Sequence, residues 1–109
     1  MIDMEFLVYM EVTGIRAGSE EESALRTAEA ARAAQLASEG TLVRLWRVPG
    51  KRANWGIWHA TDADRLHQAL FSLPLFPYLS ITVHPLAAHP NDPQTSRSSH
   101  QLNATNVKK

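Results

Sequence analysis

The order in which strand-like and helix-like segments follow one another is the feature that most constrains the fold of this chain. The six segments lie at residues 4–13, 19–39, 42–48, 53–60, 62–73 and 79–86. Alternation of side chains on two faces marks the first, third, fourth and sixth segments as strands. The second segment is an alanine-rich helix that begins at a capping serine, Ser19, and ends at Gly40. Pro74 ends the shorter second helix, which begins near Asp62.

The order β-α-β-β-α-β predicts an α+β, ferredoxin-like fold, in which both helices cover one face of a four-stranded antiparallel sheet. Because the strands carry apolar side chains on both faces, we expect a second copy of the chain to cover the other face. The expected product is a dimer that assembles into a larger ring or shell. Residues 1–93 are expected to form one domain, and residues 94–109 a polar tail that is mobile or contacts a neighbouring subunit.

The composition excludes several classes of protein. The 11 basic and 11 acidic residues balance, so the chain lacks the basic field that binds nucleic acid. No cysteine is present, which is typical of a cytoplasmic protein. Asp3 and Glu5 stand where a signal peptide would carry basic residues, and no apolar run is long enough to span a membrane. We therefore expect a cytoplasmic protein without a membrane partner.

The third segment has an unusual composition, because two arginines and a tryptophan stand among its aliphatic residues. Regular alternation places Arg44 and Trp46 on one face of this strand and Arg47 on the other. Each face therefore carries a guanidinium, and we infer that both faces are covered and that the arginines have partners. These partners are either protein carboxylates or an anionic ligand. In the next strand, Gly56 leaves room for a ring or a ligand.

The first helix carries charged residues on its apolar stripe. Glu29 and Arg32 share this stripe with two leucines. The pattern alone favours a Glu29–Arg32 pair at the edge of the buried face. The acidic residues 20–22 are interpreted as a solvated helix start.

Three further segments have a distinctive order and spacing. They are Glu39-Gly40-Thr41 leading into Leu45-Trp46-Arg47, then Leu73-Pro74-Leu75-Phe76-Pro77-Tyr78, and then Pro85-Leu86 followed by His89-Pro90. In these segments the chain resembles the muconolactone Δ-isomerase family over about residues 4–93. The resemblance implies a ferredoxin-like fold, sheets paired in a dimer, assembly into a decamer and a cytoplasmic role in aromatic degradation through the β-ketoadipate pathway.

The reaction that the resemblance implies moves the ring double bond of muconolactone, an unsaturated lactone with a carboxymethyl arm, to give the enol-lactone. A proton leaves the ring carbon that bears the arm, and a proton is delivered next to the carbonyl, through a dienolate. Such chemistry needs a base, a donor or cation near the carbonyl and a cation for the carboxylate arm. It needs no cofactor, neither metal nor nucleotide.

The resemblance implies that Glu29 is the base, because family members carry a glutamate at the same distance before the Glu-Gly-Thr segment. Burial would raise its pKa from about 4.3. Tyr78 is the second catalytic candidate, as a donor to the carbonyl, unless it is a core tyrosine with its hydroxyl at the edge. The substrate-binding candidates are Arg44, Trp46, Arg47 and Arg26, which stands where the family has lysine. Arg44 is preferred to Arg47 because it shares a face with Trp46.

Other functions remain open at this point. His84 and His89 lack partners at a spacing typical of a metal site, so none is predicted. A chloromuconolactone dehalogenase would share nearly all these features, because loss of chloride can follow the same deprotonation. A non-catalytic ferredoxin-like domain, which binds a small aromatic or serves in assembly, is the alternative from another class. An exposed Glu29 with no adjoining pocket would favour that alternative.

Overall fold

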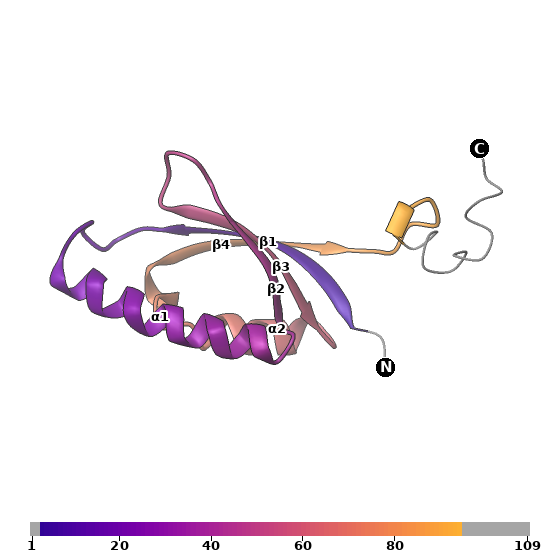
Figure 1. Ribbon diagram of the computed structural model, residues 1–109, viewed down its shortest axis with the longest axis horizontal. Helices are drawn as coiled ribbons and strands as arrows, with labels where there is room; N and C mark the ends of the chain where they lie inside the picture. The colour runs from indigo at the N-terminus through magenta and orange to yellow at the C-terminus, as the bar shows by residue number, and fades with distance from the viewer. Residues whose placement is uncertain (1–2, 95–109) are drawn as a thin grey trace.

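The computed structural model describes residues 3–94 of the chain. Its elements are β1 (Met4–Val12), α1 (Glu20–Ser38), β2 (Leu42–Arg47), β3 (Ala53–Ala60), α2 (Ala63–Phe71), a short 3₁₀ turn η1 (Phe76–Tyr78) and β4 (Leu79–Leu86). The strands pair antiparallel in the order β2-β3-β1-β4, and both helices lie on one face of the sheet (Figure 1). The predicted ferredoxin-like α+β fold is confirmed. The polar tail expected at 94–109 lies, apart from Gln94, outside the described residues.

Local signals set the ends of the helices. The Ser19 hydroxyl accepts a hydrogen bond of 3.1 Å from the backbone N–H of Glu22, and so caps α1. Gly40 follows the end of α1 with a φ of 84°, a conformation that glycine adopts without strain, and turns the chain towards β2. Asp62 caps α2 in the same way as Ser19 caps α1. Within residues 3–94, no helix has both the length and the apolar character needed to cross a membrane.

The core lies between the two helices and the sheet. Its largest fully buried side chains are Phe6, Val8, Leu36 and Trp58. Leu66 and Leu70 of α2 complete the same cluster. The opposite face of the sheet carries Tyr9 and other apolar or aromatic side chains, and no helix of the described chain covers it (Figure 1).

The predicted alternation of β2 is wrong at one point. Leu42 lies opposite Trp58, whereas Arg44 lies opposite Ile57, the adjacent residue of β3, so that Val43 is an extra residue in a bulge. A bulge of one residue changes which side chains share a face. The side chains of β2 that face the helices are therefore those of Leu42, Leu45 and Arg47.

Candidate active site

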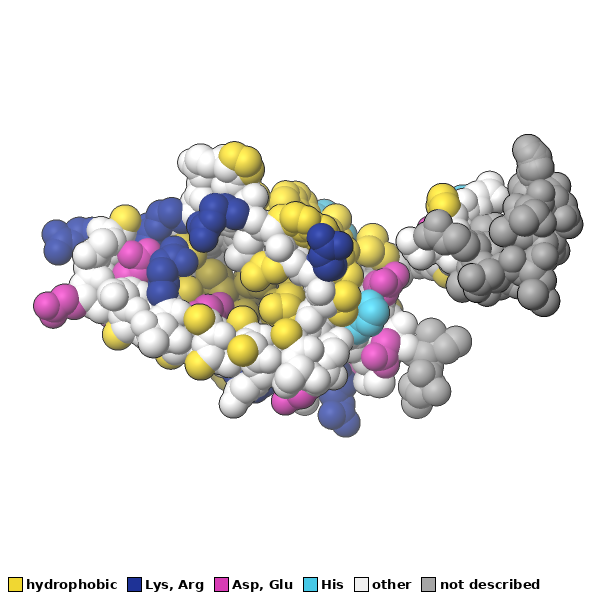
Figure 2. All heavy atoms as spheres, in the orientation of Figure 1, with side chains coloured by type: hydrophobic (Ala, Val, Ile, Leu, Met, Phe, Trp, Pro, Cys, Tyr) yellow, Lys and Arg dark blue, Asp and Glu magenta, His cyan; other side chains and the backbone are white. Residues whose placement is uncertain are grey.

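A cavity of about 380 Å³ opens between α1 and the sheet. Its polar lining residues are Arg26, Glu29, Arg47, Arg52 and Asn54, and most of the other lining side chains are apolar. Figure 2 shows a hollow between α1 and the sheet with apolar side chains at its floor and basic side chains gathered at one end. This size and this mixture of side chains are typical of a site for a small molecule.

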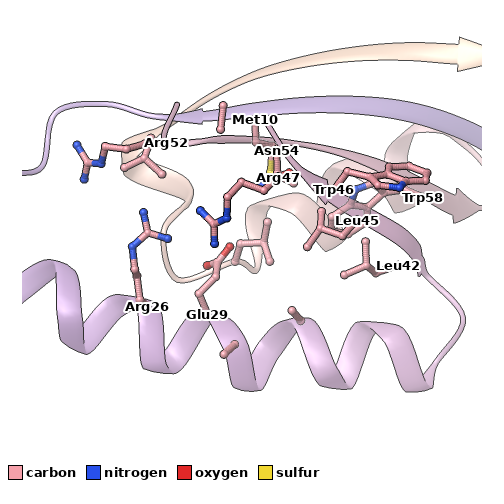
Figure 3. Close-up of a pocket in the computed structure, with 15 residues that line it drawn as sticks. Met10, Arg26, Glu29, Leu42, Leu45, Trp46, Arg47, Arg52, Asn54 and Trp58 are labelled. Atoms are coloured by element: carbon pink, nitrogen blue, oxygen red, sulfur yellow. The ribbon is translucent and has the colours of Figure 1, made fainter. Parts of the chain in front are cut away.

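Glu29 projects from α1 into this cavity (Figure 3). Its Oε1 accepts a hydrogen bond of 2.9 Å from the backbone N–H of Leu75. Leu75 is 3% exposed, so the loop between α2 and η1 holds this donor firmly against α1. Burial raises the pKa of Glu29 above 4.5, while the Leu75 N–H and the charge of Arg26 oppose this rise. The carboxyl group is thus half-buried and adjoins a cavity, which is the arrangement that a general base requires.

The pairing of Glu29 with Arg32, which the helix pattern favoured, is wrong. The Arg32 Nε donates to the Ser72 hydroxyl at 2.9 Å, and its Nη1 donates to Gln35 at 3.0 Å. Arg32 therefore joins α1 to the end of α2. Glu29 lines the cavity, and Arg32 does not.

The bulge in β2, which precedes both arginines of that strand, determines which of them faces the helices. Arg47 lines the cavity, and its guanidinium lies near the carboxylate of Glu29 in Figure 3. Within residues 3–94 the structure gives this guanidinium no ion pair. Arg44, in contrast, does not line the cavity, and its guanidinium lies 4.6 Å from the centre of the Trp46 ring. The structure thus brings Arg47, and not the preferred Arg44, to Glu29.

Of the other residues predicted from the sequence, some line the cavity and one does not. Arg26 lines the cavity one helical turn before Glu29. Trp46 borders the cavity, but its partner in the sheet is Trp55, which belongs to the face away from the helices. Tyr78 is not among the lining residues, and its hydroxyl donates to Glu21 at 3.0 Å. The hydrogen bond and the charge of Glu21 raise the pKa of Tyr78 above 10.

Glu22 contradicts the expectation of a solvated helix start. It is 8% exposed, and it accepts hydrogen bonds from the Gly18 N–H at 2.8 Å, from Arg52 at 2.6 Å and from Arg26 at 3.1 Å. The bond from Gly18, followed by those from Arg52 and Arg26, lowers the pKa of Glu22 from 4.5 to about 2. This carboxylate therefore positions two of the guanidiniums that line the cavity.

Replacing Glu22 by glutamine is expected to lower the melting temperature at neutral pH by several degrees. The folded state keeps Glu22 ionised down to about pH 2, so its contribution to stability is complete above 4.5, the ordinary pKa, and is lost as the pH falls towards 2. Thermal unfolding of both proteins between pH 7 and about pH 2 measures this difference, which should shrink over that range. Glu20→Gln, an exposed change in the same helical turn, is the control. A Glu22→Gln difference that stays constant with pH would contradict the role given to its charge.

Sequence reasoning missed Arg52 and Asn54 as parts of the site. Arg52 reaches Glu22 across 30 residues of sequence, and no local pattern signals such a pair. Asn54 lies opposite Arg47, on the helix-facing side of β3, where its amide oxygen is buried without a hydrogen-bond partner. The sequence signal that could have identified Asn54 was its polar amide on the same strand face as Gly56 and Trp58. Among the described residues, no group of three or more histidine, aspartate and glutamate side chains is placed to hold a metal ion.

The fold and the cavity define a small α+β protein with an acid/base site, in which a half-buried carboxyl group faces guanidiniums across an apolar pocket. The family model described as muconolactone delta-isomerase matches residues 4–92. The chain belongs to the muconolactone Δ-isomerase family.

Individual relatives agree with this membership. The muconolactone Δ-isomerase of Cupriavidus pinatubonensis is 46% identical over 67 residues, which cover 62% of this chain and 73% of the relative. That of Acinetobacter baylyi is 30% identical over 89 residues, or 81% of this chain and 93% of the relative. A crystal structure of muconolactone isomerase matches with a TM-score of 0.75 and 35% identity, over 83% of this chain and 95% of the other.

Proposed function

We propose that this protein moves the ring double bond of muconolactone to give 3-oxoadipate enol-lactone, without a cofactor. The observation that carries this proposal is a carboxyl group with a raised pKa, that of Glu29, in an apolar cavity that also holds the guanidiniums of Arg26 and Arg47. A carboxylate with a raised pKa is a stronger base than usual, and it also returns its proton readily once protonated. The condition that would favour a non-catalytic domain, an exposed Glu29 without a pocket, is not met.

The proposed reaction has two proton transfers. The ionised Glu29 removes the proton from the ring carbon that bears the carboxymethyl arm, and the electron pair of that C–H bond forms the new ring double bond. The electrons of the old double bond move towards the carbonyl, whose oxygen takes the negative charge of the dienolate. Glu29 then delivers its proton to the carbon next to the carbonyl, which restores the carbonyl double bond. One carboxyl group thereby serves both steps on one face of the ring.

The guanidiniums have two tasks in this proposal. Arg47 has no ion pair within the described chain and faces the cavity, so it binds the carboxylate of the substrate arm. Arg26 is held by Glu22 and supplies positive charge beside Glu29 as the dienolate forms. Arg47 thus orients the arm, while the ring lies against the apolar part of the cavity, where Leu42 and Leu45 are placed (Figure 3).

An ultraviolet assay of the purified protein with muconolactone and with its 5-chloro analogue tests the proposal. We expect turnover of muconolactone to the enol-lactone. Chloride release from the analogue, with no turnover of muconolactone, would instead identify a dehalogenase. No turnover of either lactone would contradict an enzymatic role.

We also propose that the protein assembles in the cytoplasm as a homodimer that builds a decamer. Tyr9, Trp46 and Trp55 meet on the face of the sheet that the helices leave uncovered, and Trp46 is 43% exposed there. An apolar patch of this kind is suited to a self-complementary contact with a second copy of the chain. Light scattering of the assay sample is expected to give the mass of several chains, and the mass of one chain would contradict the proposal.

A further inference from the structure

Two polar side-chain atoms are buried without a hydrogen-bond partner in the part of the chain that the structure describes. They are Asn54 Oδ1 and Trp58 Nε1. Both residues belong to β3, and both line the cavity of the candidate site. Because buried polar groups are nearly always hydrogen-bonded in folded proteins, a partner that arrives with a ligand is one explanation for such atoms.

The indole of Trp58 has a defined direction. Trp58 is 1% exposed, and its Nε1 lies 2.9 Å from the position that a β-carbon on Gly56 would occupy. The N–H edge of the ring therefore extends over Gly56, from Trp58 towards Asn54 and the polar end of the cavity. Any larger residue at position 56 would displace this edge of the indole. The expectation that Gly56 leaves room for a ring is therefore confirmed, and the ring is that of Trp58.

Leu45 lies beside the indole N–H of Trp58. Its Cδ1 lies 3.2 Å from the same β-carbon position over Gly56, and its side chain lines the cavity together with Trp58. Leu45 is 48% exposed and belongs to β2, an edge strand of the sheet. An exposed side chain on an edge strand rotates more easily than a core side chain. A ligand in the cavity can thus displace Leu45 and reach the N–H.

We propose that the Trp58 N–H donates a hydrogen bond to the carbonyl oxygen of the bound lactone, once the substrate has displaced Leu45. This inference rests on the proposed isomerase function and adds a donor that the reaction requires. The carbonyl oxygen gains negative charge when Glu29 removes the ring proton, and a fixed donor in a dry site stabilises that charge most strongly in the transition state. An indole N–H is a donor only, so it cannot act as the base.

Trp58→Phe removes the N–H and keeps an aromatic ring in the core. We expect kcat for muconolactone to fall on the order of 10²-fold, with KM little changed, because the donor acts on charge that develops during the reaction. Trp55→Phe is the matched control, because it makes the same change on the same strand but on the opposite face. A Trp58→Phe enzyme with wild-type kcat, or equal losses in both variants, would overturn the inference.

A second measurement does not depend on the folding of Trp58→Phe. In ¹⁵N-labelled Glu29→Gln protein, which should bind muconolactone without converting it, the three indole N–H resonances are assigned with Trp46→Phe and Trp55→Phe. Saturation with muconolactone is expected to move the Trp58 indole proton downfield, as a new hydrogen bond requires. An unmoved Trp58 resonance in the saturated protein would overturn the donor role. Wild-type protein that does not turn over muconolactone would instead count against the proposed function.

Discussion

Replacing Glu29 by glutamine is expected to lower kcat/KM for muconolactone by about 10³-fold, within the range typical of the loss of a general base. Glutamine has the same shape as glutamate, and its amide oxygen can still accept the hydrogen bond from the Leu75 N–H. It cannot take up the ring proton. The variant should therefore keep the fold, the assembly and the affinity for the substrate, and lose the chemical step. Steady-state kinetics of the variant and of wild type provide the measurement.

Two controls separate the charge of Glu29 from its packing. Glu20→Gln changes an exposed glutamate of the same helix and should leave kcat/KM unchanged. In wild type, kcat/KM should fall with decreasing pH through a midpoint above 4.5, because the base must be ionised and burial raises its pKa. Wild-type activity in Glu29→Gln would remove this residue from the mechanism.

The raised pKa of Glu29 also predicts whether Glu29→Gln raises or lowers the stability of the fold. Folding favours the protonated form of Glu29, so the ionised group lowers stability at pH values above its folded pKa. Glu29→Gln should consequently have a melting temperature at neutral pH that is equal to or above that of wild type, and the gain should vanish below pH 4.5. Lower activity together with a higher melting temperature would show that the loss is chemical and does not come from unfolding.

The sequence predicts those parts of the fold that local patterns determine. The alternation in residues 4–13 identifies β1 and its buried face, on which Phe6, Val8 and Met10 lie. Ser19 and Asp62 cap the helices that they were expected to cap. In each case the physical cause, a period of two or a hydroxyl or carboxylate before a helical run, lies within a few residues of its effect.

The parts of the site that sequence analysis misplaced depend on contacts between distant residues. The extra residue Val43 depends on how β2 pairs with β3, and regular alternation cannot indicate it. Glu22 is buried because Arg52 reaches it from the turn after β2, so a local reading assigns it to solvent. Leu75 reaches Glu29 across 46 residues of sequence, although the segment that contains Leu75 was already distinctive in the sequence.

Arg47→Ala is expected to raise KM for muconolactone about 10- to 100-fold, with a smaller effect on kcat. The charge-assisted hydrogen bonds of a guanidinium to the carboxylate arm contribute about 1.5–3 kcal/mol, and they exist in the bound substrate as well as in the transition state. Their loss therefore weakens binding more than it slows the chemical step. Steady-state kinetics with muconolactone measure both constants. Arg47→Lys should restore part of the affinity, because it keeps the charge but loses the bidentate geometry.

Arg44→Ala is the matched control, because both arginines belong to β2 and lie on opposite faces of the sheet, Arg44 opposite Ile57 and Arg47 opposite Asn54. Its guanidinium stacks on Trp46 outside the cavity, so the variant should keep the wild-type KM. Light scattering must accompany the kinetics, since Arg44 lies on the face that we propose for the contact with a second copy. A raised KM in Arg44→Ala, with an intact assembly and an unaffected Arg47→Ala, would mean that the substrate carboxylate is bound on the outer face of the sheet. The cavity between α1 and β2 would then not hold the arm of the substrate.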